Sequence, residues 1–266
     1  MKKIKQVIIV TKLHPNDLRP RSRHLHHQTL REVCHFLADH AVRYRIIDRK
    51  NLAKTVRSDL IITVGGDGTV LAASHYTLES PIFPINSAPT TSTGFFCRTN
   101  EKTFRPVLKR VLDGKIKPKP IPRLVTFVNG KKMRPYGLNE VLFASQLQGE
   151  TSRYQIRVGS HEEEQKSSGI WVATGAGSTG AIYSAGSKKD SVNSERLQYW
   201  IREPFRYQKN QYKLRKGFLK TGETVSITSH MNQGMIFIDG ARWHYKVKKN
   251  DRITVRGGQA PLKIFL

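Results

Sequence analysis

The segment Asp59–Leu71, DLIITVGGDGTVL, joins an apolar run to a helix-compatible run through a glycine-rich turn. Asp59–Val64 has the length and apolar character of a buried strand, and Thr69–Tyr76 suits a helix. Strands and helices alternate around this segment: strands are expected at 6–11, 42–48 and 82–85, and helices at 25–40 and 103–112. The alternation predicts a Rossmann-like α/β domain with a parallel sheet and helices on both faces.

The chain beyond residue 114 follows a different pattern. KIKPKPIP at 115–122 is proline-rich and basic and predicts an extended linker. Strands are then expected at 124–128, 138–144, 154–158, 170–174, 224–228, 235–238, 245–247 and 252–255, with a tight turn at Asn129-Gly130. We therefore predict an α/β domain at 1–116 that carries the glycine motif, and a mainly-β, sandwich-like nucleotide-binding domain at 117–248. Residues 249–266 are expected to form a C-terminal strand or strands, for which a return to the N-terminal domain is one placement.

The composition is that of an ordered and very basic protein. With 46 Lys and Arg against 20 Asp and Glu, the formal net charge is +26, which favours nucleic acid, an acidic membrane surface or phosphate-rich small molecules as partners. A solvated basic surface is the alternative. No run approaches the roughly 20 apolar residues of a membrane span, and no signal peptide is recognisable. Cys34 and Cys97 have neither zinc spacing nor a disulfide framework, so we expect a cytoplasmic protein.

The glycine-rich turn carries the clearest chemistry. Gly65 and Gly66 have no Cβ and let phosphate oxygens approach backbone N–H groups, and the helix that opens at Gly68 and Thr69 adds partial positive charge. Asp67 stands at the carboxyl end of the strand, where open α/β sheets bind ligands. A carboxylate there can accept the proton of an attacking hydroxyl, and capping of the helix is the alternative role. Because the chain has no G-x-x-x-x-G-K-[ST] motif, a phosphate transfer would not use a P-loop.

Two other segments place polar or small residues at expected strands. Asn139 and Glu140 interrupt the apolar run 137–143, so at least one of them points to a buried side; a ligand site and a hydrogen-bonded core pair both fit. Gly175–Gly180 matches G-x-G-x-x-G, but it lies in the β-rich half instead of the first turn of a βαβ unit. We interpret it as a turn of small residues after the 170–174 strand, which a ligand can approach closely.

Two charged clusters are interpreted as surface features. His24, His26 and His27 fit a solvated helix start better than a metal site, since His24 and His27 have no carboxylate or cysteine partner nearby. Glu162–Glu164 fits a charged loop or hairpin tip. The sequence therefore predicts no metal ion held by protein side chains.

Taken in order, the motifs resemble those of the NAD kinase family. The family motifs are GGDGT at 65–69, Asn139-Glu140, and the Gly-Ser-Thr run at 177–179 with Ser184-Ala185-Gly186. INSAPTTSTGFFC at 85–97, KSSGIWVATGAGS at 166–178, IREP at 201–204 and FIDG at 237–240 are similar to the mitochondrial-type branch. GGDGT alone is shared with diacylglycerol and sphingosine kinases, but the full order of motifs is specific, and the similarity covers most of 59–240.

The resemblance implies an NAD kinase-like fold and phosphorylation of the 2'-hydroxyl of the adenosine ribose of NAD or NADH. Asp67 would accept the proton of that hydroxyl, and Asn139 and Glu140 would hold ribose hydroxyls. The residues implied to bind NAD are Gly68, Asn139, Glu140, Lys166, Ser168, Thr174, Gly177, Ser178, Thr179 and Ser184, and those implied to bind ATP phosphates are Gly65, Gly66 and Thr69. The donor would be Mg²⁺-bound ATP or polyphosphate. A homodimer or homotetramer is expected, with no membrane partner and no specific nucleic acid partner.

Two alternatives and two departures from the family pattern accompany this interpretation. A lipid kinase of the same superfamily would use the basic surface to dock on a membrane, and a nucleic-acid-binding module with a relic nucleotide site would show salt-dependent binding without turnover. The chain has TGAGSTGA at 174–181 where the bacterial pattern is TPTGSTAY, and Ser168 where that pattern has Asp before Gly169. The preference between NAD and NADH is therefore left open.

Overall fold

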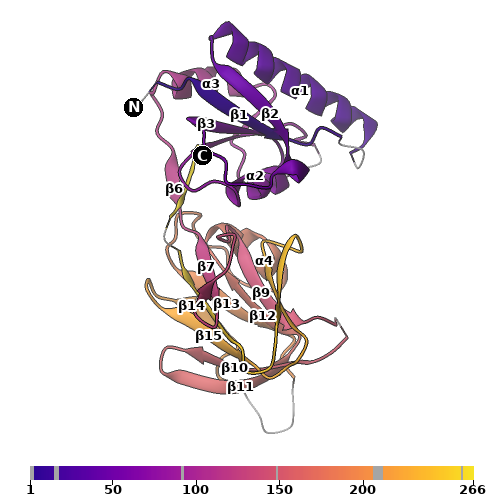
Figure 1. Ribbon diagram of the computed structural model, residues 1–266, viewed down its shortest axis with the longest axis vertical. Helices are drawn as coiled ribbons and strands as arrows, with labels where there is room; N and C mark the ends of the chain where they lie inside the picture. Colours follow the sequence, from indigo (N-terminus) through magenta and orange to yellow (C-terminus); the bar gives the residue numbers. More distant parts are fainter. Residues whose placement is uncertain (1–2, 15–17, 91–92, 148, 206–211, 259) are drawn as a thin grey trace. The chain divides into compact units, whose positions relative to one another are not determined.

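The computed structural model describes residues 3–14, 18–90, 93–147, 149–205, 212–258 and 260–266. The chain divides into two compact units (Figure 1), Met1–Pro120 with Leu262–Leu266, and Ile121–Pro261. The chain thus leaves the first unit once and returns to it for the last five residues. The expected division after residue 248 differs from this arrangement, because the strand at 252–257 belongs to the second unit.

The first unit is an α/β domain. Its strands are β1 (Gln6–Thr11), β2 (Arg43–Asp48), β3 (Leu60–Gly65), β4 (Ile82–Asn86), β5 (Thr99–Asn100), β6 (Lys119–Ile121) and β19 (Leu262–Ile264). Its helices are α1 (Pro20–Asp39), α2 (Asp67–Ser74), α3 (Phe104–Leu112) and the 3-10 helix η1 (Arg49–Asn51). The sheet order is β2-β1-β3-β4-β19-β6 with β5 paired to β4, and the pairs of β1 with β2, β1 with β3, β3 with β4, and β4 with β5 and β19 are parallel.

The strand β3 lies in the interior of the sheet, and both of its faces are buried. Leu60, Ile62 and Val64 share one hydrophobic core with residues of α1 and α3. Figure 1 shows α2 on the opposite face of the sheet. This two-sided cover is the parallel-sheet arrangement that the alternating sequence pattern predicted. Part of the expected linker differs from the prediction, because Lys119–Ile121 forms β6 next to β19.

The second unit is a sandwich of two antiparallel sheets, as the sequence predicted. One sheet has the order β11-β10-β15-β18-β7-β8 and consists of β7 (Leu124–Val128), β8 (Lys131–Lys132), β10 (Ser152–Val158), β11 (His161–Ser167), β15 (Thr224–Ser229) and β18 (Arg252–Gly257). The other has the order β14-β13-β12-β9-β16-β17 and consists of β9 (Glu140–Ser145), β12 (Gly169–Ala173), β13 (Leu197–Arg202), β14 (Lys216–Leu219), β16 (Gly234–Ile238) and β17 (Trp243–Val247). The short helices η2 (Ala176–Thr179) and α4 (Ala181–Ser184) follow β12.

Alternating side chains build the core between the two sheets. In β15 the residues Val225 and Ile227 are buried and join the inward residues of the facing sheet, such as Val141 and Phe143. The tight turn expected at Asn129-Gly130 connects β7 to β8, and both of its residues have positive φ.

The acidic run Glu162–Glu164 lies within a strand, so its expected position in a loop or hairpin tip is wrong. It belongs to β11, which pairs with β10 along its whole length, and the hairpin turns at Gly159 and Ser160 instead. Arg157 of β10 forms an ion pair with Glu162, with a distance of 2.6 Å between Nη2 and Oε2. Cross-strand pairing of opposite charges explains how an acidic run is accommodated in a strand.

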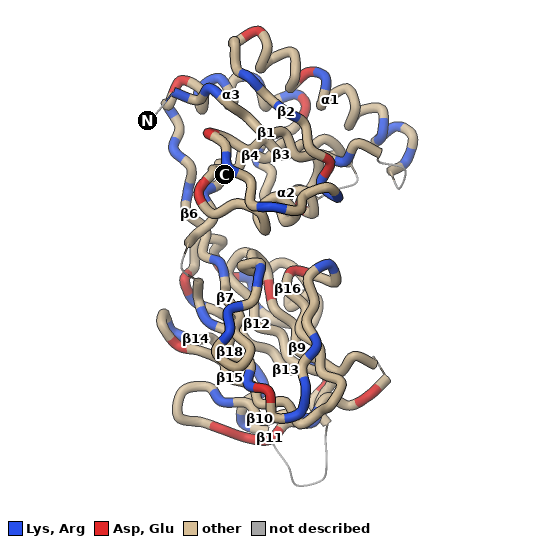
Figure 2. The backbone as a smooth tube through the Cα atoms, viewed as in Figure 1, with Lys and Arg blue, Asp and Glu red and all other residues tan. Residues whose placement is uncertain are grey.

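The basic residues do not gather in one part of the chain. Figure 2 shows Lys and Arg distributed over both units. Within the residues that the structure describes, no helix is both long and apolar enough to cross a membrane.

Candidate active site

The turn after β3 shows why glycine is required there. Gly65 has φ +156°, and a Cβ on it would lie 2.3 Å from Thr69 Oγ1. Thr69, expected to contact phosphate, is itself buried, and its hydroxyl packs against Gly65. Gly66 is the N-cap of α2, and Gly68 is exposed, with Arg49 Nη1 3.4 Å from the position that a Cβ on Gly68 would take. A cation therefore lies beside a helix N-terminus, and both features attract anions.

The Asp67 carboxylate binds a neighbouring loop. Asp67 is the first residue of α2, and its Oδ2 and Oδ1 accept hydrogen bonds from the N–H groups of Phe95 (2.9 Å) and Phe96 (2.8 Å). The helix has no side-chain cap, so the alternative role of Asp67 as its N-cap is not what the geometry shows. Each carboxylate oxygen has a second lone pair, and Asp67 is only half-buried, so the group can still accept a proton.

A buried histidine supports the same end of the sheet. His26 is 2% exposed, so its expected place in a solvated helix start is wrong. Its Nδ1 lies 2.6 Å from Ser87 Oγ, and its Nε2 lies 3.1 Å from Thr11 Oγ1 and 2.9 Å from the oxygen of Lys12. Burial lowers the pKa of His26, so the neutral ring joins α1 to the loops after β1 and β4.

Cys97 adjoins Asp67 in this unit. Burial, together with the charge of Asp67, raises the pKa of the Cys97 thiol to about 12. The thiol is therefore protonated at neutral pH and is not a nucleophile there.

In the second unit, Asn139 and Glu140 are held from two sides. The Asp239 carboxylate, just after β16, accepts hydrogen bonds from the N–H groups of Leu138 (2.7 Å), Asn139 (2.7 Å) and Glu140 (3.1 Å). On the other side, Thr174 Oγ1 donates to the oxygen of Leu138 at 2.6 Å, and Thr174 N–H donates to the oxygen of Asn139 at 2.9 Å. This double attachment fixes the backbone from which the two side chains project.

One side-chain oxygen of each of these two residues is buried without a partner among the described residues. Asn139 Oδ1 and Glu140 Oε2 accept no hydrogen bond from any residue that the structure describes. Burial and, to a lesser extent, the charge of Asp239 raise the pKa of Glu140 to about 8. Buried polar atoms normally have partners, so two adjacent ones without them indicate a place for a ligand.

The glycines of the G-x-G-x-x-G segment form one wall beside this pair. A Cβ on Gly177 would lie 2.1 Å from the oxygen of Asn139, and a Cβ on Gly180 would lie 3.3 Å from Glu140 Oε2. A Cβ on Gly175 would lie 2.0 Å from the oxygen of Ser191. The segment follows a strand of an antiparallel sheet and continues as a 3-10 helix, so it is a close-approach turn and not a Rossmann fingerprint.

The structure brings together only some of the residues expected to bind NAD. Ser178 is buried, and its hydroxyl donates to the oxygen of Gly175 (2.7 Å) and accepts from the N–H of Asp190 (2.8 Å). Thr179 is half-buried in the turn, and Ser184 is exposed at the end of α4.

Lys166, in β11, and Ser168, just before β12, lie near the end of β12 that is opposite to Asn139 and Glu140. Ala173 of β12 pairs with Glu140, whereas Ser168 precedes the first residue of the strand. Thr174 lies six residue steps of extended chain beyond Ser168, which corresponds to roughly 20 Å. The structure therefore does not bring Lys166 or Ser168 next to the pair.

Two residues of this site were not among the site residues predicted from the sequence. Asp239 lies about 100 residues from the peptides it binds, and Arg123, the largest fully buried side chain, interacts with it electrostatically. The local signals for Asp239 were the FIDG motif at 237–240 and its turn-forming Asp-Gly pair, in which Asp239 adopts a positive φ of 51°.

No three His, Cys, Asp or Glu side chains in the described parts of the chain are grouped as metal ligands. A Mg²⁺ ion that arrives on donor phosphates keeps several waters and needs only one or two protein carboxylates. The single carboxylate of Asp67, beside a turn suited to phosphate, fits such an ion.

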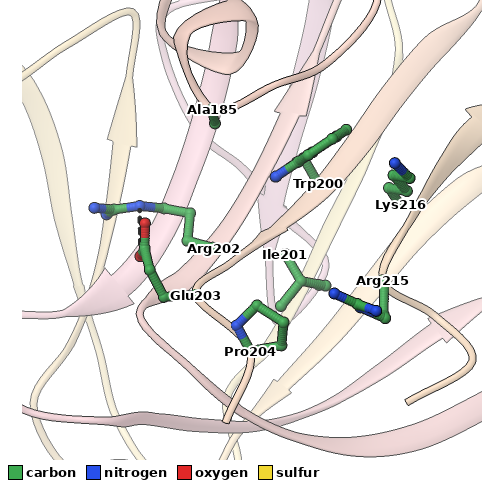
Figure 3. Close-up of a pocket in the computed structure, with 8 residues that line it drawn as sticks. All are labelled: Ala185, Trp200, Ile201, Arg202, Glu203, Pro204, Arg215 and Lys216. Atoms are coloured by element: carbon green, nitrogen blue, oxygen red, sulfur yellow. Dashed lines mark ion pairs between the residues drawn. The ribbon is translucent and has the colours of Figure 1, made fainter. Parts of the chain in front are cut away.

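A separate cavity of about 250 Å³ is lined by residues of β13 and β14 and of the segments next to them (Figure 3). Figure 3 shows Trp200 near Ala185, and Arg202 in an ion pair with Glu203, whose Oε2 lies 3.7 Å from the Arg202 Nε. The other lining residues are Ile201, Pro204, Arg215 and Lys216. None of these eight described residues has a buried side-chain atom without a partner, which distinguishes the cavity from the Asn139–Glu140 site.

Comparison with known proteins gives consistent results. Residues 7–116 match the family model of the ATP-NAD kinase N-terminal domain. A probable NADH kinase of Oryza sativa subsp. japonica is 30% identical over 94% of this chain and 84% of its own length. An NAD kinase of Archaeoglobus fulgidus, solved in complex with ATP, superposes with a TM-score of 0.77 at 20% identity over 98% of this chain and 93% of its own. Yeast NADH kinase complexed with NADH superposes with a TM-score of 0.78 at 16% identity over 99% of this chain and 84% of its own.

Proposed function

Because the chain belongs to the NAD kinase family and is therefore an NAD(H) kinase, we propose how its residues divide the reaction. The terminal phosphate of Mg²⁺-bound ATP is transferred to the 2'-hydroxyl of the adenosine ribose of NAD or NADH. Asp67 accepts the proton of that hydroxyl, and Asn139 and Glu140 hold ribose hydroxyls. Asp67 belongs to the first unit, and Asn139 and Glu140 belong to the second.

The observation that carries this proposal is the pair of partnerless oxygens. Asn139 Oδ1 and Glu140 Oε2 are buried on a backbone that Asp239 and Thr174 fix in place. Ribose hydroxyls donate and accept hydrogen bonds, so they can satisfy both side chains. A Cβ on Gly180 would lie 3.3 Å from Glu140 Oε2, so the absence of that Cβ leaves the space beside this oxygen open.

The turn at Asp67 supports the phosphate half of the proposal. Gly68 lies at the N-terminus of α2 with Arg49 beside it, so the turn favours an anion. Phosphoryl transfer requires alignment and charge stabilisation more than covalent chemistry, and Mg²⁺ on the donor neutralises part of the phosphate charge. Asp67 then accepts the proton as the hydroxyl oxygen attacks.

The test is product formation by the purified chain. The protein is incubated with Mg²⁺-ATP and either NAD or NADH, and NADP(H) is measured with an NADP-dependent reporter enzyme. Polyphosphate replaces ATP in a parallel reaction, and a diacylglycerol acceptor tests the lipid-kinase alternative. No NADP(H) from either acceptor with either donor would overturn the proposal.

A homodimer or homotetramer and a cytoplasmic location also remain predictions from the sequence. Size-exclusion chromatography with light scattering tests the first. Localisation of a tagged chain in its own cells tests the second.

A further inference from the structure

A completely buried arginine lies where the chain passes between its two units. Arg123 is 1% exposed, three residues after Pro120, the last residue of the first unit before the crossing. Its Nε and Nη2 donate hydrogen bonds to the oxygen of Ala260, at 2.9 and 2.6 Å, and Ala260 lies just before the return crossing. A Cβ on Gly258 would lie 2.0 Å from the oxygen of Arg123, so the outgoing and returning segments are in close contact.

The buried cation also interacts with two residues near the proposed ribose site, Tyr136 and Asp239. The guanidinium carbon of Arg123 lies 5.0 Å from the centre of the Tyr136 ring. Burial lowers the pKa of Arg123 to about 10, and Tyr136 and Asp239 oppose that shift. The group therefore remains a cation at neutral pH, and Asp239 is its acidic counterpart.

Two acidic side chains share this region, and their hydrogen bonds differ. Both oxygens of Asp239 accept N–H bonds, three in all, which suits a carboxylate because an ionised carboxylate only accepts. Glu140 Oε2 has no partner in the described structure and is buried. Glu140 is buried whereas Asp239 is half-buried, and the negative charge of Asp239 disfavours a second charge on Glu140, so Glu140 keeps a proton.

We propose that Arg123 is a positioning residue of the nucleotide site: its buried cation holds the side chain of Asp239 against the peptides of Leu138–Glu140, and the buried carboxyl group of Glu140 keeps its proton. Glu140 then presents an O–H donor to an oxygen of the bound nucleotide. The inference rests on the proposed function, in which Glu140 contacts the substrate ribose. The direction of the Glu140 pKa, raised to about 8 by burial and by Asp239, agrees with it.

A purely structural role of Arg123, as a tie between the two crossing segments, predicts different behaviour. In that case its loss would weaken nucleotide binding regardless of the residue at 140. If Arg123 acts through the proton on Glu140, the two substitutions are coupled and a double-mutant cycle reveals it. Glu140→Gln is the informative partner, because glutamine is neutral at all pH values and keeps an N–H donor.

The experiment measures dissociation constants of NAD and NADH for the full chain by calorimetry at pH 7 and pH 9. Wild-type affinity should fall by about tenfold over this range as Glu140 ionises, whereas Glu140→Gln should change by less than about twofold. At pH 7, Arg123→Met should weaken binding at least about fivefold with glutamate at 140, and less than about twofold in the Glu140→Gln background. Arg123→Lys, which keeps the charge, should recover most of the loss.

Arg157→Met is the matched control, since Arg157 is an exposed arginine of the same unit, paired with Glu162. It should bind like wild type. An equal loss for Arg123→Met in both backgrounds, or a wild-type affinity unchanged between pH 7 and 9, overturns the inference. If Arg123→Met does not fold, the pH profiles of wild type, Glu140→Gln and Arg123→Lys still decide it. A wild-type chain that binds neither nucleotide overturns the proposed function instead.

Discussion

Replacing Glu140 by glutamine should stabilise the second unit at neutral pH. The carboxyl group is 8% exposed, and burial raises its pKa from 4.5 to about 8. A raised pKa in an acid means that the folded chain binds this proton more tightly than the unfolded chain. The contribution of Glu140 to wild-type stability is therefore greatest below pH 4.5, falls as the pH rises from 4.5 to about 8, and is level above that range.

The size of the effect follows from the same two pKa values. Over this range the free energy of unfolding decreases by about 1.4 kcal/mol for each pH unit, which amounts to about 3 kcal/mol between pH 4.5 and pH 7. Glutamine has the shape of the protonated acid and never ionises, so Glu140→Gln should lack this decline. The two proteins should be similarly stable at pH 4.5 and differ by about 3 kcal/mol at pH 7.

The assay can report on the second unit alone. All 3 tryptophans, Trp171, Trp200 and Trp243, belong to that unit, so urea unfolding followed by tryptophan fluorescence measures its stability. Other titrating groups cancel in the difference between the wild-type and Glu140→Gln curves. Glu164→Gln, the same change at an exposed strand position, is the control and should alter stability by less than about 0.5 kcal/mol. The reasoning is refuted if the difference in unfolding free energy between Glu140→Gln and wild type does not change from pH 4.5 to 8. It is also refuted if Glu164→Gln shows the same increase over wild type as Glu140→Gln.

Three further predictions test other parts of the structure. Asp67→Asn should keep the circular dichroism spectrum of the wild type and lose about 10²- to 10⁴-fold in NADP(H) production, and near wild-type turnover would contradict the role of this carboxylate. Gly177→Ala places a Cβ 2.1 Å from the oxygen of Asn139 and should weaken NAD binding, whereas Gly149→Ala, with nothing within 4 Å, should bind normally; equal affinities would contradict the tight wall. His26 is buried with a lowered pKa, so the stability that it contributes is present above pH 6.5 and is lost as the pH falls below that value. Thermal melts at pH 7 and pH 5 should therefore show a smaller decrease in melting temperature for His26→Gln than for wild type.

The sequence predicted the elements whose pattern is local. The apolar run of β3 and the alternation of β15 depend only on which faces are buried, and both were found within a residue or two of their expected limits. The acidic run of β11 was misplaced because its strand character comes from pairing with β10, and no propensity of Glu162–Glu164 indicates that pairing. Similarly, β6 could not be predicted from its local sequence, because it is a strand through its pairing with β19, about 140 residues later.

The predicted site residues divide in a related way. Asn139 and Glu140 were recognisable because two polar residues in an apolar strand need an explanation, and the structure leaves an oxygen of each without a partner. Ser178 and Thr69 were expected as ligands from their motifs, yet Ser178 Oγ bonds the neighbouring backbone and Thr69 Oγ1 packs on Gly65. A sequence shows that a hydroxyl group is present, but it does not show which hydrogen-bond partner the fold places next to that hydroxyl.

The G-x-G-x-x-G segment shows why a motif can indicate a ligand class for the wrong physical reason. In a Rossmann turn the glycines make room for the pyrophosphate of a dinucleotide. Here a Cβ on Gly175 or Gly177 would collide with backbone oxygens of Ser191 or Asn139, so these two glycines make room for the protein's own chain. Only Gly180 borders a group without a partner, Glu140 Oε2. The close approach that the glycines permit brings the turn against Asn139 and Glu140, and the site then depends on these two side chains and on Asp239, which fixes their backbone.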